Sequence, residues 1–201
     1  MISTPRSCAH GKRPKIFILG RLLTCLAALL WLIGASGICR AAAPGSRVLV
    51  VVNESSAASK EIGAYYAAKR HVPSSNICRI KCPTTEEVDE SVYMSDILAP
   101  VANALSKPAL HGSVDYIVLT KGVPLRIHSD APSANPQFSP NGDSVDSRLM
   151  CQDIAGLGSP SRNPFFKSEK RFSHKNTSLY LVTRLDGYTV KDAEGLVNRS
   201  L

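Results

Sequence analysis

The sequence predicts an α/β domain with a mainly parallel sheet and flanking helices, Rossmann-like or caspase-like in its three layers. Short apolar, β-branched runs alternate with segments of helical periodicity throughout residues 44–201. These runs are continuously apolar, which is typical of strands that are buried on both faces of a parallel sheet.

The first strand is predicted over residues 47–52, "RVLVVV". Polar residues 53–56 end it and can cap a helix. In residues 58–70, Ile62 and Tyr65 share one side, and the segment ends in two basic residues that complement the helix dipole. We therefore expect a strand followed by an amphipathic helix.

A second short strand is predicted over residues 77–81. Thr84 and Glu87 have the spacing of a capping box, which predicts a helix from this point. Helical spacing continues to Leu105, and Pro100 should kink or restart that helix.

The next strand, residues 114–120, is predicted to lie in the middle of the sheet. Periodicity is lost over 121–177, a loop too long for a plain connection, which favours a functional loop or an insertion. The last strand is predicted over 178–183, and Thr189 should cap a helix that begins at Val190.

The segment 1–43 predicts a signal peptide. It contains six basic and no acidic residues, an apolar run over 22–33, and an alanine triplet that ends at Ala43. A basic region, an apolar region and an A-x-A site predict cleavage after Ala43 and export to the periplasm or cell envelope. The alternative is an uncleaved membrane anchor, because the apolar stretch 22–39 approaches the roughly 20 residues that span a bilayer.

The basic charge of the chain belongs mostly to this leader. Residues 44–201 contain 18 Lys and Arg against 16 Asp and Glu, so the formal charge falls from +8 to +2. One segment, 162–175, interleaves basic residues with phenylalanines, a pattern that resembles binding sites for single-stranded nucleic acid. A solvated loop explains that segment better, and we expect no nucleic-acid partner.

Three cysteines remain after the leader: Cys78, Cys82 and Cys151. On an extended strand Cys78 and Cys82 would share a face but lie roughly 13 Å apart, too far for a mutual disulfide. Either Cys151 pairs with one of them in an oxidising compartment, or all three are buried thiols.

Ligands of open parallel sheets bind beyond the carboxyl ends of the strands. That edge should carry Asn53 and Glu54, then Pro83 and Thr84. The ligand-binding residues that we predict there are Asn53, Lys121, Arg126, Asp146, Arg184 and Asp186. The long loop should bring further polar groups to the same edge, namely His128, Asp143 and Asp153.

No standard catalytic motif is complete. The chain lacks a dinucleotide-binding loop, a P-loop and a nucleophile elbow. The segment 141–147, "NGDSVDS", is better explained as a turn than as a calcium loop. His128 could meet Cys151 only if the long loop folds back, whereas His111 precedes its strand and belongs to the opposite edge. We therefore predict no cofactor and no metal site.

Six blocks of sequence resemble an uncharacterised family of exported bacterial proteins that occurs in species with exosortase-type sorting systems. The blocks are "VVNESSAASKEIGAYYAAKRHVPSSNIC", "CPTTEEV", "DYIVLTKGVPLRI", "SVDSRL", "NPFF" and "LVTRLDGYTVKDAEGLVNRSL". Membership implies a longer protein, which agrees with a helical pattern that is still running at Leu201. It implies no particular reaction.

The segment 182–201 is also similar in layout to an element of the gingipain-type cysteine peptidases, which have a caspase-like α/β fold. In those peptidases the catalytic His-Gly and Cys follow later strands, which implies that they would lie beyond residue 201 here.

Three functions are therefore open. The first is an exported binding or accessory module linked to cell-surface protein sorting, without a complete active site in this chain. The second is the N-terminal portion of a caspase-like cysteine peptidase. The third is a surface enzyme that uses the loop carboxylates on a carbohydrate.

Overall fold

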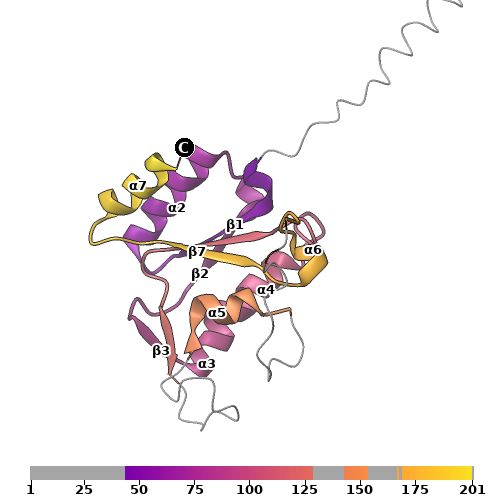
Figure 1. Cartoon of the computed structure of the whole chain (residues 1–201). Helices are drawn as coiled ribbons and strands as arrows, with labels where there is room; N and C mark the ends of the chain where they lie inside the picture. The colour runs from indigo at the N-terminus through magenta and orange to yellow at the C-terminus, as the bar shows by residue number, and fades with distance from the viewer. Residues whose placement is uncertain (1–43, 129–142, 154–166, 168, 201) are drawn as a thin grey trace, which may run out of the picture. The chain divides into compact units, whose positions relative to one another are not determined.

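The structure is a computed structural model that describes residues 44–128, 143–153, 167 and 169–200 (Figure 1). Residues 42–201 form one compact unit, to which the following description is confined. The predicted signal peptide and its cleavage site lie outside the described residues. No helix within the described ranges is both long enough and apolar enough to cross a membrane.

A four-stranded parallel sheet forms the centre of this unit, in the order β2-β1-β4-β7. Its strands are β1 (Val48–Asn53), β2 (Ile77–Ile80), β4 (Tyr116–Thr120) and β7 (Leu181–Leu185). All six residues of β1 are buried, as its continuous apolar pattern predicts.

Helices cover both faces of the sheet (Figure 1). Helices α2 (Ala57–Arg70) and α7 (Val190–Arg199) pack together on one face, around Ile62 and Val197. The other face is covered by α4 (Ala99–Leu105) and by α5 (Val145–Met150). The predicted α/β fold with a mainly parallel, three-layered arrangement is therefore confirmed.

The ends of α2 and α7 are fixed by local hydrogen bonds. The Ser56 side chain accepts from the Ser59 N–H and begins α2, and His71 ends it in the left-handed conformation. Thr189 and Asp192 form a reciprocal capping box that begins α7, as the sequence predicts.

The segment after β2 does not begin a helix at Thr84, so that prediction is wrong. Glu87 lies in a short strand, β3 (Glu87–Asp89), which pairs with β5 (Arg126–His128). Strand β5 also pairs with β6 (Asp143–Ser144), which completes a second, three-stranded sheet. Cross-strand hydrogen bonds to a partner far along the chain outweigh the local capping signal.

The helical segment that follows is interrupted near Pro100. A short helix, α3 (Glu90–Val92), leads into a π-helical turn, Tyr93–Leu98, before α4 begins. Pro100 lies where the π-helical turn passes into α4, so the residue that has no N–H coincides with the change in helical hydrogen bonding.

The long segment 121–177 contains more order than its lost periodicity predicts. Besides β5, β6 and α5, it contains α6 (His174–Thr177). The last strand begins three residues later than predicted and ends at Leu185, so Arg184 lies inside β7 and not in the turn after it. The remaining short elements are 3-10 helices, Pro44–Arg47 and Ser74–Asn76.

Cys78, Cys82 and Cys151 are free thiols, so a disulfide to Cys151 is not formed. Cys78 and Cys82 are both buried in the same core as α4, in agreement with the predicted shared face. Cys151 is half-buried at the end of α5.

Candidate functional site

Asn53 lies at the carboxyl end of β1 and is fully buried. Its Nδ2 donates to Cys82 O (3.1 Å) and to Gly122 O (2.7 Å). Its Oδ1 accepts from Ser55 N (3.0 Å) and from Cys82 N (3.3 Å). The Asn53 amide therefore joins the chain ends that leave β1, β2 and β4, and it has no hydrogen-bonding group left for a ligand.

A buried network of hydrogen-bonded hydroxyl groups lies beneath the same edge of the sheet. The Asn53 N–H donates to Ser59 Oγ (2.7 Å), and Thr120 Oγ1 donates to Val51 O (2.9 Å). Ser59 Oγ lies 2.5 Å from Thr120 Oγ1. Because the Thr120 proton is directed at Val51, Ser59 is the donor in this contact, and every group in the chain is satisfied.

Gly122 allows the turns after β1 and β4 to approach closely. Its φ is +93°, and a Cβ atom at this position would lie 2.5 Å from Ser56 Oγ. A side chain is therefore excluded both by the backbone conformation and by the neighbouring cap residue.

Lys121 and Asp186 meet across the ends of β4 and β7. Lys121 Nζ lies 2.9 Å from Asp186 Oδ1 and donates to Gly187 O (2.6 Å). Burial works to raise the pKa of Asp186, but the hydrogen bonds from Lys121 and from the Gly187 N–H outweigh it, so the pKa lies below its usual value. Lys121 is therefore a paired ammonium group and not a free amine nucleophile.

Arg184 connects β7 to the loop after β4 and to α5. Its guanidinium donates to Val123 O (2.6 Å), to Pro124 O (2.9 Å) and to Asp146, whose Oδ1 lies 2.5 Å from NH2. Nε is 3.4 Å from Asp146 Oδ2, which makes the ion pair bidentate. The Arg184 side chain is 10% exposed, so these contacts are largely shielded from water.

Arg126 is placed on the second sheet, where it is 61% exposed and pairs with Glu87 across β3 and β5 (3.4 Å). His128 Nδ1 lies 3.4 Å from the other oxygen of Glu87. Of the six predicted ligand-binding residues, Lys121 therefore pairs with Asp186, and Arg184 pairs with Asp146. Arg126 instead pairs with Glu87, which is not one of the six.

Two further carboxylates of the long loop do not extend this edge. The side chain of Asp143 lies outside the described residues. Asp153 accepts from the Tyr180 hydroxyl (2.7 Å), and Tyr180 directly precedes β7, so this contact lies at the amino edge of the sheet. Within the described ranges no group of three His, Cys, Asp or Glu residues is arranged to hold a metal ion.

The contacts at the amino edge form a closed cluster. The Tyr180 ring stacks on His174 with centroids 3.9 Å apart, and His174 Nε2 lies 3.5 Å from Asp153 Oδ2. The His174 backbone N–H donates to Asp115 Oδ1 (2.8 Å), and Asp115 is ion-paired with Arg47. Burial, followed by the hydrogen bond to Asp153, raises the pKa of Tyr180, so its phenol stays protonated. This cluster locks α6 onto the sheet.

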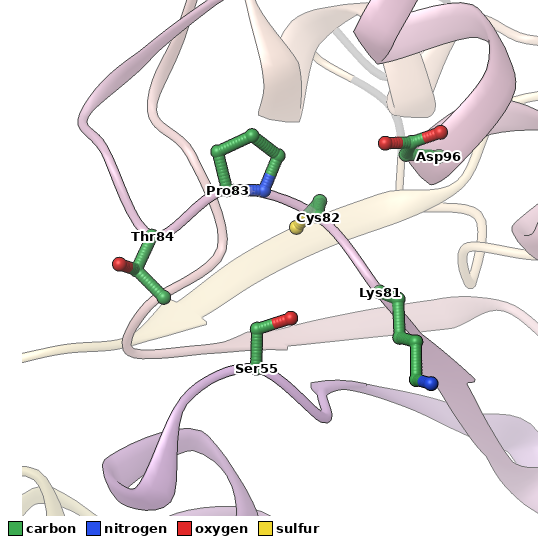
Figure 2. A pocket seen from close by; sticks show the side chains of 6 residues that line it. All are labelled: Ser55, Lys81, Cys82, Pro83, Thr84 and Asp96. Atoms are coloured by element: carbon green, nitrogen blue, oxygen red, sulfur yellow. The ribbon is translucent and has the colours of Figure 1, made fainter.

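A pocket of about 460 Å³ opens at the carboxyl ends of β1 and β2 (Figure 2). It is lined by Ser55, Lys81, Cys82, Pro83, Thr84 and Asp96. In Figure 2, Thr84 and Asp96 lie on opposite sides of Cys82. The hydroxyl groups of Ser55 and Thr84 make no hydrogen bond within the described part of the chain, which leaves them available to a ligand.

The cysteine thiols are not activated. Burial, assisted by the charge of Asp96, raises the pKa of Cys82 to about 12. Burial also raises the pKa of Cys78 to about 11 and raises the pKa of Cys151. A nucleophilic cysteine needs the opposite shift, so neither Cys82 nor Cys151 has the electrostatics of a catalytic thiol.

The sequence indicated the edge on which this pocket lies but not most of its lining. Thr84 was expected there because it follows a predicted strand, and the same reasoning extends to Ser55 and Lys81. Asp96 gives no such signal, because it lies in the helical segment whose π-turn changes which side chains face the sheet.

No family model matches the chain, and no curated protein or solved structure matches it either.

Proposed function

We propose that the chain is an exported binding or accessory module that serves cell-surface protein sorting in bacteria, and that its ligand occupies the pocket beside Cys82. The observation that carries this proposal is a pocket at the ligand-binding edge of a parallel sheet, lined by available polar groups. Its volume of about 460 Å³ suits a small ligand or the end of a polypeptide.

The state of the reactive groups favours binding over catalysis. Lys121 is held by Asp186, and Arg184 by Asp146 and two carbonyl groups. The Cys82 thiol stays protonated, because its pKa is raised to about 12. A binding module needs fixed hydrogen-bond donors and acceptors but no activated nucleophile. The carboxyl edge of the sheet supplies such donors and acceptors.

Export and the connection to sorting rest on the sequence. The basic, apolar and alanine-rich succession of residues 1–43 supports secretion. The six blocks that resemble the exosortase-associated family support a role in cell-surface sorting.

A complementation experiment tests this function in a bacterium that carries the gene and an exosortase-type system. We expect deletion to release sorted surface proteins into the medium and the wild-type gene to restore their retention. Thr84→Trp, which fills the pocket from an exposed position, should fail to restore it. His111→Trp, at an exposed position on the opposite edge, is the matched control and should restore it fully.

Retention is measured by immunoblotting of envelope and medium fractions, with circular dichroism to confirm that both variants fold. Unchanged retention after deletion would overturn the role in sorting. Full restoration by Thr84→Trp would overturn the role of the pocket.

A second candidate is the N-terminal portion of a caspase-like cysteine peptidase. It is favoured by the parallel sheet with helices on both faces. A longer reading frame that encodes His-Gly and Cys after additional strands would support it. The reading frame beyond residue 201 separates the two candidates. Thiol labelling tests a different point, namely whether Cys82 itself is a nucleophile.

Under the binding proposal, iodoacetamide at about pH 8 should leave Cys78 and Cys82 unmodified in the folded chain, because their thiolate fractions are very small. Peptide mass spectrometry reports the modification, and the same chain in concentrated guanidinium chloride is the control, in which both should react. Rapid alkylation of Cys82 in the folded chain would contradict a binding pocket whose thiol is unreactive.

A further inference from the structure

One wall of the pocket beside Cys82 carries excess positive charge. Glu54 lies among three cations, Arg79, Lys60 and Lys81, all of which lower its pKa, with the hydrogen bond from Arg79 the largest cause. Arg79 NH1 is 2.5 Å from Glu54 Oε1 and satisfies this carboxylate. Lys81, which lines the pocket, forms no ion pair with a carboxylate among the described residues.

Another part of the pocket wall carries one negative charge, that of Asp96. Asp96 accepts from the Ser95 hydroxyl through Oδ1 (2.7 Å) and forms no ion pair with any described residue. Its charge reaches the pocket, because it is one of the two causes that raise the pKa of Cys82. Figure 2 shows the Lys81 side chain directed away from Asp96.

The other polar groups that line the pocket are uncharged. The hydroxyl groups of Ser55 and Thr84 can each donate and accept, and the Cys82 thiol stays neutral. Ser55 directly precedes Ser56, the cap of the 14-residue helix α2, so the positive end of that helix dipole adds to the Lys81 side.

We propose that this pocket binds a short peptide with both termini free, with its carboxylate toward Lys81 and Ser55 and its ammonium group toward Asp96. This inference rests on the proposed function in so far as it places the ligand in the same pocket. A ligand with only negative charge would be repelled by Asp96, and one with only positive charge by Lys81. An apolar ligand would find little beyond Pro83 to cover it.

The test uses dialanine as the probe, with N-acetyl-dialanine and dialanine amide as forms that lack one charge each. Amide chemical shifts of the isotope-labelled full-length chain report binding at Ser55, Lys81, Thr84 and Asp96. We expect dialanine to bind at this pocket and each capped form to bind about threefold to tenfold more weakly, the range for a partly exposed charge pair.

Variants assign each charge to its wall. Lys81→Met should abolish the preference for dialanine over dialanine amide, and Asp96→Asn should abolish the preference over N-acetyl-dialanine. Lys107→Met and Glu61→Gln remove exposed charges that do not line the pocket, and they should leave both preferences unchanged.

The outcomes separate this inference from the proposed function. Equal binding of all three probes at the pocket would overturn the zwitterionic ligand while leaving the pocket as a binding site. Absence of any shift at the pocket residues would also overturn the peptide ligand. Sorting by the Thr84→Trp variant is measured independently and decides whether the proposed function falls as well.

Discussion

Asn53 determines how the turns at the carboxyl edge fit together, because its amide binds backbone groups of three separate segments. Asn53→Asp would replace two donors by a buried carboxylate oxygen that faces the carbonyls of Cys82 and Gly122. We expect the free energy of unfolding to fall by about 2–4 kcal/mol, since a buried charge would be left against acceptors.

Urea unfolding measures this loss. Asn198→Asp is the matched control, because Asn198 uses its Oδ1 to accept from the Tyr65 hydroxyl and an exposed aspartate keeps that acceptor. The control should change stability by no more than about 0.5 kcal/mol. Equal losses of unfolding free energy in the two variants would show that the two N–H donors of Asn53 do not contribute to stability.

Gly122 is the second residue on which this edge depends. Gly122→Ala should destabilise the fold more than Gly112→Ala does. Both glycines have positive φ, but nothing lies within 4 Å of a Cβ at Gly112, whereas Ser56 Oγ lies 2.5 Å from one at Gly122. We expect about 1 kcal/mol for the backbone conformation in each and at least about 1 kcal/mol more at Gly122.

Thermal or urea unfolding of the two variants gives the difference directly. Because the backbone contribution is shared, the excess at Gly122 measures the close approach of the turns after β1 and β4. An excess of zero would mean that Ser56 moves aside without cost.

At this scale the sequence predicted where a polar residue lies but not what it does. Asn53 was expected at the edge because it follows an apolar run. Its partners Cys82 and Gly122 are 29 and 69 positions away and contribute backbone atoms, which have no sequence signature. A ligand-binding role for Asn53 remains a prediction, but its amide is already fully used.

At the scale of elements, Arg184 ties β7 to α5 and to the turn that follows β4. Arg184→Met removes the donors to Val123 O and Pro124 O and leaves Asp146 without its partner. We expect a loss of about 2–3 kcal/mol in the free energy of unfolding. The Val145 amide, which donates to Leu125 O at the start of α5, should exchange with deuterium faster.

Arg126→Met is the control for Arg184→Met. Arg126 is 61% exposed and forms a surface ion pair with Glu87, so its loss should cost no more than about 0.5 kcal/mol. If the two arginine variants proved equally stable, the bidentate contact with Asp146 would contribute nothing measurable.

The errors of sequence-based prediction concern short elements with distant partners. Strands β3 and β5 have three residues each and β6 has two, so no periodicity can develop within them. The Thr84 and Glu87 pair satisfied a local capping rule, yet Glu87 lies opposite Arg126 in a parallel ladder. Long apolar runs such as β1 and β4 were predicted correctly, because burial on both faces leaves a clear pattern.

At the scale of the whole molecule, we expect the free energy of unfolding to fall as the solution becomes acidic. A carboxyl group whose pKa is lower in the folded state than in the unfolded state stabilises the fold. This contribution is fully present at pH values above the unfolded-state pKa. It is lost as the pH falls through the folded-state pKa. Glu54, Asp186 and Asp192 all have lowered pKa values. For Asp186 the reference value is 3.8, so its contribution is lost below about pH 4.

Asp186→Asn should therefore reduce the drop in unfolding free energy between about pH 5 and about pH 2.5. Urea titrations at the two pH values measure it. Glu61→Gln is the control, since Glu61 is exposed on α2 and forms no ion pair with a described residue. An unchanged pH dependence in Asp186→Asn would contradict the stabilising role of the Lys121–Asp186 pair.

The fold class followed from the alternation of apolar runs and helical segments, because this pattern is a property of the whole chain. The pocket did not follow in the same way. Its walls come from the turn after β1, the segment after β2 and the π-helical turn, and only tertiary packing brings Asp96 into the same pocket as Lys81.

The strand order also has a consequence for the rates of folding and unfolding. Val50 of β1 pairs with Ile77 of β2, 27 positions later, whereas Lys121 and Asp186 are separated by 65. Closing the longer loop costs more entropy, so we expect β7 to join the sheet after the βαβ unit of β1, α2 and β2 has formed. Interactions made late are absent from the folding transition state. Loss of Arg184 should therefore accelerate unfolding while leaving the folding rate almost unchanged, so that β7 sets the lifetime of the folded protein.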